Sequence, residues 1–246
     1  GKWALTVNPN DTVGISEKPE LVPLDRLKAM YRFEPPRWKG WNTVEACEAV
    51  LSGKVNAFIS LGGNFVRAIP ERDAMEAAWR RIGLTVNIAT KLNRSHLLPG
   101  GTAFLLPCLG RSEEDRQATG PQVVTVEDSL SCIHGSVGRR APASEHLFSE
   151  LAIVAGIAKA TLPANPEVEW DRWVGDYGIV RERIEETYPQ FFGKFNQRLF
   201  VLGGFYRGNS ARERIWKTES GKAEFTVPRS LSATSFEDSP GRWRLM

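Results

Sequence analysis

Cysteine and histidine are scarce in this chain, and their spacing excludes the common metal sites. The 246 residues contain three cysteines and three histidines, all widely separated, with no CxxC or HExxH arrangement. A zinc finger or an iron–sulfur centre needs such clustered ligands. We therefore expect no metal ligand in this chain, and the cysteine usage fits a reducing cytoplasm.

Long hydrophobic runs and a strong charge imbalance are also missing. No stretch reaches the roughly 18 apolar residues of a membrane-spanning helix, and the start GKWALTVNPND lacks the layout of a signal peptide. The net charge of +3, from 32 basic and 29 acidic residues, gives no reason to expect nucleic acid as a partner. We expect a cytoplasmic protein without a membrane span.

The apolar pattern in the first half of the chain predicts a β-α-β unit. Residues 55–61 form a nearly continuous apolar run, as in a strand covered on both faces. Residues 70–82 have the period of an amphipathic helix, and residues 84–89 read as a second strand. Such a unit closes with parallel strands. Before it, Asn42 and Glu45 have the spacing of a capping box at a helix start.

The remaining pattern completes an α/β fold, which we expect to be an open, mostly parallel sheet flanked by helices, as in Rossmann-like domains. The further expected elements are a short helix at 24–33, a buried strand at 102–107, a strand at 122–128, a helix at 144–160, short helices at 178–188 and 192–199, and strands within 214–227. The expected organisation is an irregular lead-in at 1–40, an α/β domain at 41–162, and the rest of that domain with a linker at 163–246.

A glycine pair follows the first strand, at the edge where open parallel sheets bind ligands. Gly62 and Gly63 allow backbone N–H groups to approach a phosphate closely. The loop matches neither GxGxxG nor a P-loop. The glycine pair therefore has two possible roles at this point: it binds a phosphate, or it forms a turn that needs small residues for packing.

The end of the second strand carries polar and basic side chains without a carboxylate. The stretch ATKLNRSH offers Thr90, Lys91, Asn93, Arg94, Ser95 and His96. NAD-type folds place an acidic residue there to hold a ribose. This cluster suits phosphate oxygens or an acceptor-rich base better, and a solvated loop is the plain alternative.

A series of motifs resembles one enzyme family. LGGNFVRAIPE, TKLNRSHLLPGG, LPCLGRSEEDRQ, QVVTVEDSLSCIHGS and SGKAEF follow one another in this order. Together they resemble the formate-dehydrogenase-like molybdopterin oxidoreductases, above all the large alpha-subunit type. The resemblance covers nearly the whole chain.

The resemblance implies a cofactor and partners. Large subunits of this family hold molybdenum through a pair of molybdopterin guanine dinucleotides (Mo-bis-MGD), and this chain resembles their middle, dinucleotide-binding-like domain. The remaining domains of the same polypeptide would supply the metal ligand and, where present, an iron–sulfur cluster. The implied activity is the two-electron oxidation of a small substrate such as formate, with electrons passed to a further partner. The isolated segment is expected to be inactive.

The resemblance also implies which residues contact the cofactor. No catalytic residue falls in this chain. By motif position, the implied contacts are Gly62, Gly63 and Asn64 at the phosphates and sugar, Thr90, Lys91, Asn93 and Arg94 near the guanosine, and Glu127, Asp128 and Ser129 in a polar turn close to the cofactor.

Two other classes of function remain as alternatives. A stand-alone nucleotide-binding module or NAD-type dehydrogenase would need a GxGxxG turn and a ribose-binding carboxylate, and the chain lacks both. A protein-interaction domain would bind no ligand and would expose an apolar face.

Overall fold

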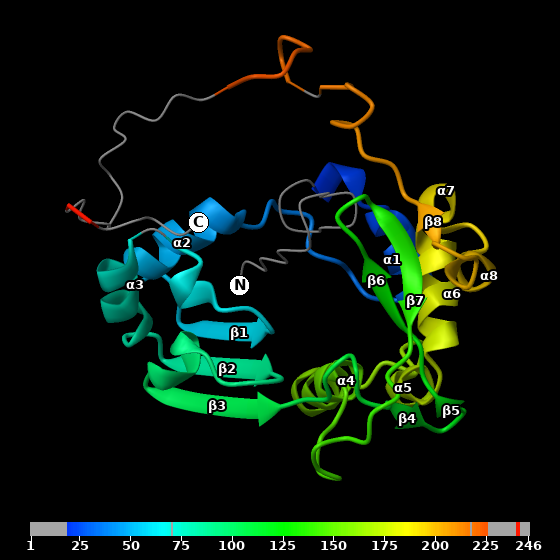
Figure 1. Cartoon of the computed structure of the whole chain (residues 1–246), viewed down its shortest axis with the longest axis horizontal. Coiled ribbons are helices and arrows are strands. Elements are labelled where there is room, and N and C mark those ends of the chain that lie inside the picture. Colours follow the sequence, from blue (N-terminus) through cyan, green and yellow to red (C-terminus); the bar gives the residue numbers. More distant parts are fainter. Residues whose placement is uncertain (1–18, 70, 217, 226–239, 242–246) are drawn as a thin grey trace. The chain divides into compact units, whose positions relative to one another are not determined.

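The chain forms two compact units that interleave along the sequence. The computed structural model describes residues 19–69, 71–216, 218–225 and 240–241 (Figure 1). Of the described residues, the first unit comprises those within 1–46, 88–91 and 105–209, and the second comprises those within 47–87, 92–104 and 210–246. The division into a lead-in, an α/β domain and a C-terminal part stays a prediction. The expected irregular chain at residues 1–18 lies outside the described residues.

A small parallel sheet carries the predicted β-α-β unit. Its three strands lie in the order β1 (Ala57–Leu61), β2 (Leu84–Ala89) and β3 (Thr102–Pro107), and their arrows point the same way in Figure 1. The helix α3 (Arg72–Trp79) connects β1 to β2. The α/β class is confirmed, and the sheet is consistent with a Rossmann-like arrangement.

One face of β1 packs into the core of the second unit. Phe58 lies between two aromatic rings, with centroids 4.7 Å from Trp79 and 4.8 Å from Phe65. Met75 and Trp79 of α3 are fully buried. The helix α2 (Thr43–Leu51) adds Val50 to the same cluster. Its start has the predicted capping box, in which Asn42 and Glu45 exchange two hydrogen bonds of 2.9 Å.

The opposite face of β1 is open, which corrects the expectation of a strand covered on both faces. Ile59 and Leu61 are 54% and 55% exposed, because alternate side chains of a strand point to opposite faces. β3 is not the expected buried strand either, since Phe104 is 54% exposed. The apolar run at 55–61 correctly predicted a strand, but it does not determine which faces of that strand are buried.

The sheets of the first unit are antiparallel. β6 (Val124–Glu127) pairs with β7 (Cys132–Ser136), which pairs with β8 (Phe205–Tyr206). A small hairpin joins β4 (Arg116–Gln117) to β5 (Gly120–Pro121). The expected mostly parallel pairing therefore holds for β1 to β3 and not for these sheets.

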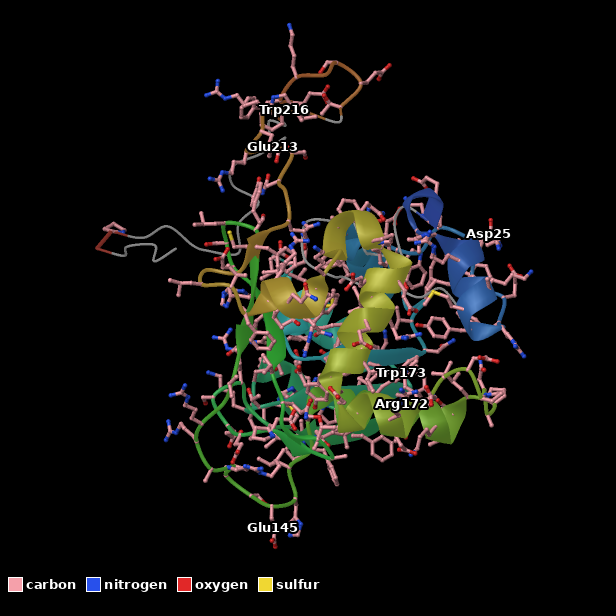
Figure 2. All side chains as sticks on the ribbon, turned by 90° about the vertical axis from the view of Figure 1, so that its right-hand side faces the viewer. Asp25, Glu145, Arg172, Trp173, Glu213 and Trp216 are labelled. Atoms are coloured by element: carbon pink, nitrogen blue, oxygen red, sulfur yellow. The ribbon has the colours of Figure 1, made fainter. Side chains whose placement is uncertain are left out.

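Six helices are described in the first unit besides the start of α2. They are α1 (Leu24–Tyr31), α4 (Glu150–Thr161), α5 (Trp170–Gly175), α6 (Tyr177–Thr187), α7 (Pro189–Phe192) and α8 (Phe195–Leu199). Phe195 of α8 packs edge-on against Phe205 of β8, with ring centroids 5.7 Å apart. Arg172 and Trp173 mark α5 in Figure 2, and the Trp173 ring lies 5.7 Å from that of Tyr31.

Two element bounds differ from the expectation. The helix expected from residue 144 begins at Glu150, because the Ser149 hydroxyl accepts a hydrogen bond from the Ala152 N–H at 3.1 Å and caps the helix there. Strands expected within 214–227 do not form in the described residues 214–216 and 218–225, which are turns and irregular chain. The remaining short elements are 3-10 helices at Pro19–Leu21, Phe65–Arg67 and Arg94–Leu97.

A buried polar network crosses the first unit. The Tyr177 hydroxyl lies 2.5 Å from Asp115 Oδ2 and 2.7 Å from Ser149 Oγ. Burial, together with the hydrogen bond to Asp115, raises the pKa of Tyr177. The network ties the hairpin region to the start of α4.

We expect Tyr177→Phe to destabilise the protein by about 1–3 kcal/mol, because it leaves Asp115 and Ser149 buried with a lost partner. Urea denaturation monitored by circular dichroism measures this loss. Tyr188→Phe is the matched control, since Tyr188 is also buried and its hydroxyl has no hydrogen-bond partner in the described part of the chain. Equal losses in the two variants would show that the network does not stabilise the unit.

Candidate functional site

The glycine loop at the end of β1 has an unusual backbone. Gly62 and Gly63 have φ angles of +68° and +75°, in the left-handed region that side chains rarely adopt. A Cβ atom built on either glycine would have no neighbour within 4 Å among the residues that the structure describes. The loop therefore needs glycine for its backbone angles and not for close packing, and the space beside both residues is open.

The carbonyl groups of this loop are engaged, whereas two of its N–H groups are free. The carbonyl of Gly62 accepts from Ser60 Oγ at 2.7 Å, and that of Gly63 accepts from Asn93 Nδ2 at 2.7 Å. Within the described residues, nothing accepts a hydrogen bond from the N–H groups of Gly63 and Asn64. A loop whose carbonyl groups are already hydrogen-bonded, and whose N–H groups are available as donors, suits an anionic ligand such as a phosphate.

Asn93 braces the loop from the turn that follows β2. Besides its bond to Gly63, its Oδ1 accepts from the Ser95 N–H at 3.0 Å. Its own N–H donates to His96 Nδ1 at 3.0 Å, which completes a capping box. Burial lowers the pKa of His96, which favours the neutral ring that this bond requires. The predicted site residues Gly63 and Asn93 are thus brought together.

Ser95 is a second brace and is nearly buried, at 4% exposure. Its hydroxyl oxygen accepts from the Val66 N–H at 3.3 Å and lies 3.3 Å from Asn64 Oδ1. Both residues that it contacts belong to the segment after the glycine pair. Ser95 thereby fixes the direction in which this segment leaves the sheet.

Arg94 is engaged within the protein. Its guanidinium makes a two-pronged pair with the carboxylate of Glu76 on α3, at 2.8 Å for Nε, and Arg67 lies 3.2 Å from the same carboxylate. The predicted role of Arg94 as a cofactor contact stays a prediction. In this structure it ties the turn after β2 to α3, and the hydrogen bond from Arg94 lowers the pKa of Glu76.

The Glu76 pair predicts a pH dependence of stability. Because the folded pKa of Glu76 lies below its ordinary value of 4.5, the stabilisation is present above that value and is lost as pH falls through the folded pKa. Between about pH 6 and about pH 3, the wild type should therefore lose more free energy of unfolding than Glu76→Gln. Urea denaturation at each pH measures both losses.

Glu48→Gln is the matched control for this experiment. Glu48 is an exposed carboxylate on α2 with no ion pair among the described residues. Its variant should follow the wild type across the pH range. Parallel curves for the wild type and Glu76→Gln would contradict the pairing.

The other predicted residues at the end of β2 are exposed. Thr90 and Lys91 form a bend directly after the strand, and both group with the first unit. Lys91 makes no ion pair in the part of the chain that the structure describes. Their proximity to the cofactor stays a prediction.

The predicted polar turn lies at the β6–β7 hairpin of the first unit. Glu127 ends β6 and lies 3.4 Å from the guanidinium of Arg207. Asp128 closes the turn, since its Oδ1 accepts from the N–H groups of Leu130 at 2.8 Å and Cys132 at 3.0 Å. The hydrogen bond from Cys132 lowers the pKa of Asp128. Ser129 is exposed, and the role of all three near a cofactor stays a prediction.

Sequence reasoning missed two residues that shape the loop. Ser95 belongs to the polar stretch after β2 but not to the predicted contacts, and Glu76 lies in the predicted amphipathic helix. Ser95 owes its role to contacts with Asn64 and Val66, which lie about 30 residues earlier in the chain, so no local pattern marks it. No local signal identifies Glu76, because its partner Arg94 is 18 residues away in the chain.

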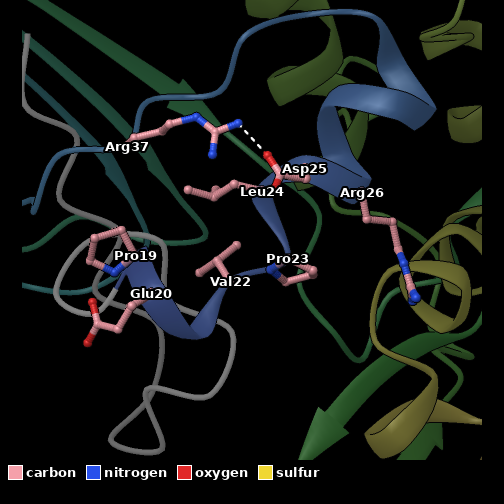
Figure 3. Close-up of a pocket in the computed structure, with 8 residues that line it drawn as sticks. All are labelled: Pro19, Glu20, Val22, Pro23, Leu24, Asp25, Arg26 and Arg37. Atoms are coloured by element: carbon pink, nitrogen blue, oxygen red, sulfur yellow. Dashed lines mark hydrogen bonds and ion pairs between the residues drawn. The ribbon is translucent and has the colours of Figure 1, made fainter.

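Other cavities offer weaker candidates. A cavity of about 610 Å³ beside α1 is lined by Asp25, Arg26 and Arg37 (Figure 3), but Arg37 is paired with Asp25 at 2.7 Å and Arg26 donates to the carbonyl of Glu186 at 2.9 Å. Within the described ranges, no three His, Cys, Asp or Glu side chains gather as a metal site would require. No described helix is long and apolar enough to cross a membrane.

Comparison with known proteins gives relatives that are longer than this chain. Protein YdeP of Escherichia coli O6:H1 (strain CFT073) is 47% identical over 225 residues, which are 92% of this chain and 29% of that protein. A protein of Mycobacterium tuberculosis (strain H37Rv), named an uncharacterized oxidoreductase, is 40% identical over 222 residues, 90% of this chain and 28% of that protein. No protein-family model matches the chain.

The chain therefore spans less than a third of the curated relatives that it matches. Its own residues align almost completely, whereas most of each relative lies outside the alignment. This chain is similar, over nine-tenths of its length, to one segment of longer proteins, some of which are named oxidoreductases.

Proposed function

We propose that this chain is the segment of a molybdopterin-dependent oxidoreductase, of the formate-dehydrogenase type, that holds one guanine dinucleotide of the molybdenum cofactor. Three lines support the proposal. The motif series of the sequence resembles that family, relatives at 40% identity are named oxidoreductases, and the loop after β1 presents free donors at the edge of a parallel sheet.

The N–H groups of Gly63 and Asn64, which have no acceptor in the described part of the chain, carry the proposal. Their carbonyls are already bonded, so the loop is left with donors alone. Donors fixed in position before a ligand arrives hold a pyrophosphate without reorganisation, which reduces the cost of binding. Asn93 and Ser95 hold the loop in this conformation and are positioning residues.

The residues of the loop fit the phosphate part of such a cofactor. Gly63 and Asn64 would donate to the phosphate oxygens, and Arg94, paired with Glu76, would hold the turn after β2 against α3. When bound, the molybdenum of the cofactor supplies the electron transfer to and from the substrate. In this chain the described residues bind and orient, and formate is the proposed substrate of the full-length enzyme.

Titration calorimetry of the purified protein with GDP, ADP and NAD⁺ tests the proposal. We expect GDP to bind, with ADP and NAD⁺ binding at least about tenfold more weakly, a difference of about 1.4 kcal/mol. Tighter binding of NAD⁺ would overturn the proposal in favour of a dehydrogenase. Equal binding of GDP and ADP would show that the loop holds phosphate without selecting guanine.

A further inference from the structure

A cavity of about 270 Å³ lies in the first unit, where the end of α1 meets the chain before α5, α5 itself and α6. Its apolar walls include Pro166 and Trp173, and its polar lining consists of Tyr31, Glu167, Glu169 and Arg183. Apolar walls with a few polar groups are the usual composition of a site for a small molecule. Which ligand such a site takes depends on the polar groups that have no partner yet.

Contacts between these elements hold the walls of the cavity in place. Asn165 Nδ2 donates to the carbonyl of Tyr31 at 2.7 Å and joins the end of α1 to the chain before α5. The ring of Tyr31 meets that of Trp173 edge-on, with centroids 5.7 Å apart. Arg26 on α1 donates to the carbonyl of Glu186 on α6 at 2.9 Å. A ligand therefore meets walls that are already ordered, which lowers the cost of binding.

The two carboxylates of the lining are already paired. Glu167 lies 3.0 Å from Arg32 Nε, and Glu169 lies 2.8 Å from Arg172 Nη1. Both of these arginines lie outside the cavity lining. Because their guanidinium groups balance the two negative charges, the carboxylates neither require a cationic ligand nor strongly repel an anion.

The polar groups left without a partner are hydrogen-bond donors. Arg183 pairs with Glu186 through Nη1 at 2.8 Å, and its buried Nε has no partner among the described residues. The hydroxyl of Tyr31 likewise has no partner in the part of the chain that the structure describes. Burial raises the pKa of Tyr31, so its phenol stays protonated and remains a donor. Buried donors in proteins usually have an acceptor, so this pair of groups points to a ligand that brings one.

We propose that this cavity binds a small monocarboxylate with an apolar body, held by the hydroxyl of Tyr31 and the guanidinium of Arg183. The carboxylate accepts hydrogen bonds from both groups, and a hydrogen bond between charged groups is stronger than one between neutral groups. The apolar body lies against Pro166 and Trp173. The cavity belongs to the first unit, whereas Gly62 and Gly63 belong to the second. This inference therefore does not depend on which cofactor the glycine loop holds.

Titration calorimetry of the purified full-length protein with sodium benzoate tests the site. Benzoate combines one carboxylate with a flat apolar ring. We expect saturable binding with a dissociation constant of about 1 mM. Benzamide, which has nearly the same shape and no charge, should bind at least about tenfold more weakly. Formate, which has no apolar body, should not displace benzoate at an equal concentration.

Two variants and one control assign the binding to this cavity. We expect the dissociation constant of benzoate to rise at least about tenfold in Arg183→Gln, which removes the charge, and at least about threefold in Tyr31→Phe, which removes only the hydroxyl. Tyr31→Phe keeps the ring beside Trp173, so it keeps the test decisive if Arg183→Gln fails to fold. Arg116→Gln is the matched control and should bind benzoate like the wild type, because Arg116 forms an exposed ion pair with Glu114 and does not line the cavity.

Three outcomes would overturn the proposal. The first is that the wild type shows no saturable binding of benzoate. The second is equal affinity for benzoate and benzamide, or displacement of benzoate by formate, since the site would then not recognise a carboxylate on an apolar body. The third is wild-type affinity in a folded Tyr31→Phe variant, which would place the ligand elsewhere. If benzoate binds as expected and GDP does not, only the proposed cofactor is rejected.

Discussion

Replacing Gly63 by alanine should weaken GDP binding about tenfold. The residue has a φ of +75°, and a side chain in this region costs about 1–2 kcal/mol. Without a ligand, the loop of the alanine variant can relax to a negative φ. In the relaxed loop, the N–H groups of Gly63 and Asn64 no longer point toward the same ligand. Binding must then restore the strained backbone, so the cost appears as lost affinity. Titration calorimetry measures the ratio of dissociation constants.

Gly53→Ala is the matched control for strain. Gly53 has a φ of +72°, and its added Cβ would also meet none of the described atoms within 4 Å, but it lies after α2 and not in the loop. Gly53→Ala should keep the wild-type affinity for GDP, because its strained backbone lies outside the loop. Gly63→Asn should bind better than Gly63→Ala, because asparagine tolerates the left-handed region. An unchanged affinity in Gly63→Ala would contradict the role of the loop.

Replacing Trp79 by alanine should destabilise the protein by about 3–5 kcal/mol, the usual cost of removing a fully buried tryptophan. Its ring is completely buried and packs on Phe58, at 4.7 Å, and Phe65, at 5.8 Å between centroids. Phe65 begins the segment that follows the glycine loop. The loss should therefore appear both in the urea midpoint and in the affinity for GDP.

Two comparisons separate packing from surface effects. Trp38→Ala removes a tryptophan that is 51% exposed. Surface substitutions usually change the free energy of unfolding by about 0.5 kcal/mol, so this variant should lose about one kcal/mol at most. Trp79→Phe should cost far less than Trp79→Ala, since the buried indole N–H of Trp79 has no partner among the described residues and nothing is left unpaired by its removal. Similar losses for Trp38→Ala and Trp79→Ala would contradict the assigned core.

Local patterns predicted the elements near the site and not their surroundings. The capping box of Asn42 and Glu45, the helix before Gly83 and the strand at 84–89 follow from short-range rules, and the structure confirms them. The exposure of Ile59 depends on what packs across the sheet, which no local pattern contains. The helix α4 begins at Glu150 after the Ser149 cap, and the hydroxyl of Ser149 also bonds to Tyr177, a contact 28 residues away that no local pattern contains.

The sequence predicts which residues lie at the strand ends, whereas their roles at a cofactor stay predictions. The sequence placed Gly62, Gly63 and Asn93 at strand ends, and the parallel topology brings these ends together. It did not show that Arg94 is held by Glu76, because the two residues lie on different elements. The predicted residues thus fall into two groups. Gly63 and Asn64 have N–H groups without an acceptor among the described residues, whereas Asn93 and Arg94 use their side chains to hold the loop and the turn after β2.

The most direct test of the central claim is the cofactor content of the purified full-length protein. Molybdenum is measured by mass spectrometry, and guanosine monophosphate is measured after acid hydrolysis of the bound cofactor. We predict molybdenum and guanosine monophosphate together in the wild type, and a marked loss of both in Gly63→Ala but not in Gly53→Ala. A folded protein that carries NAD⁺ or a flavin, with neither molybdenum nor guanosine monophosphate, would contradict the account.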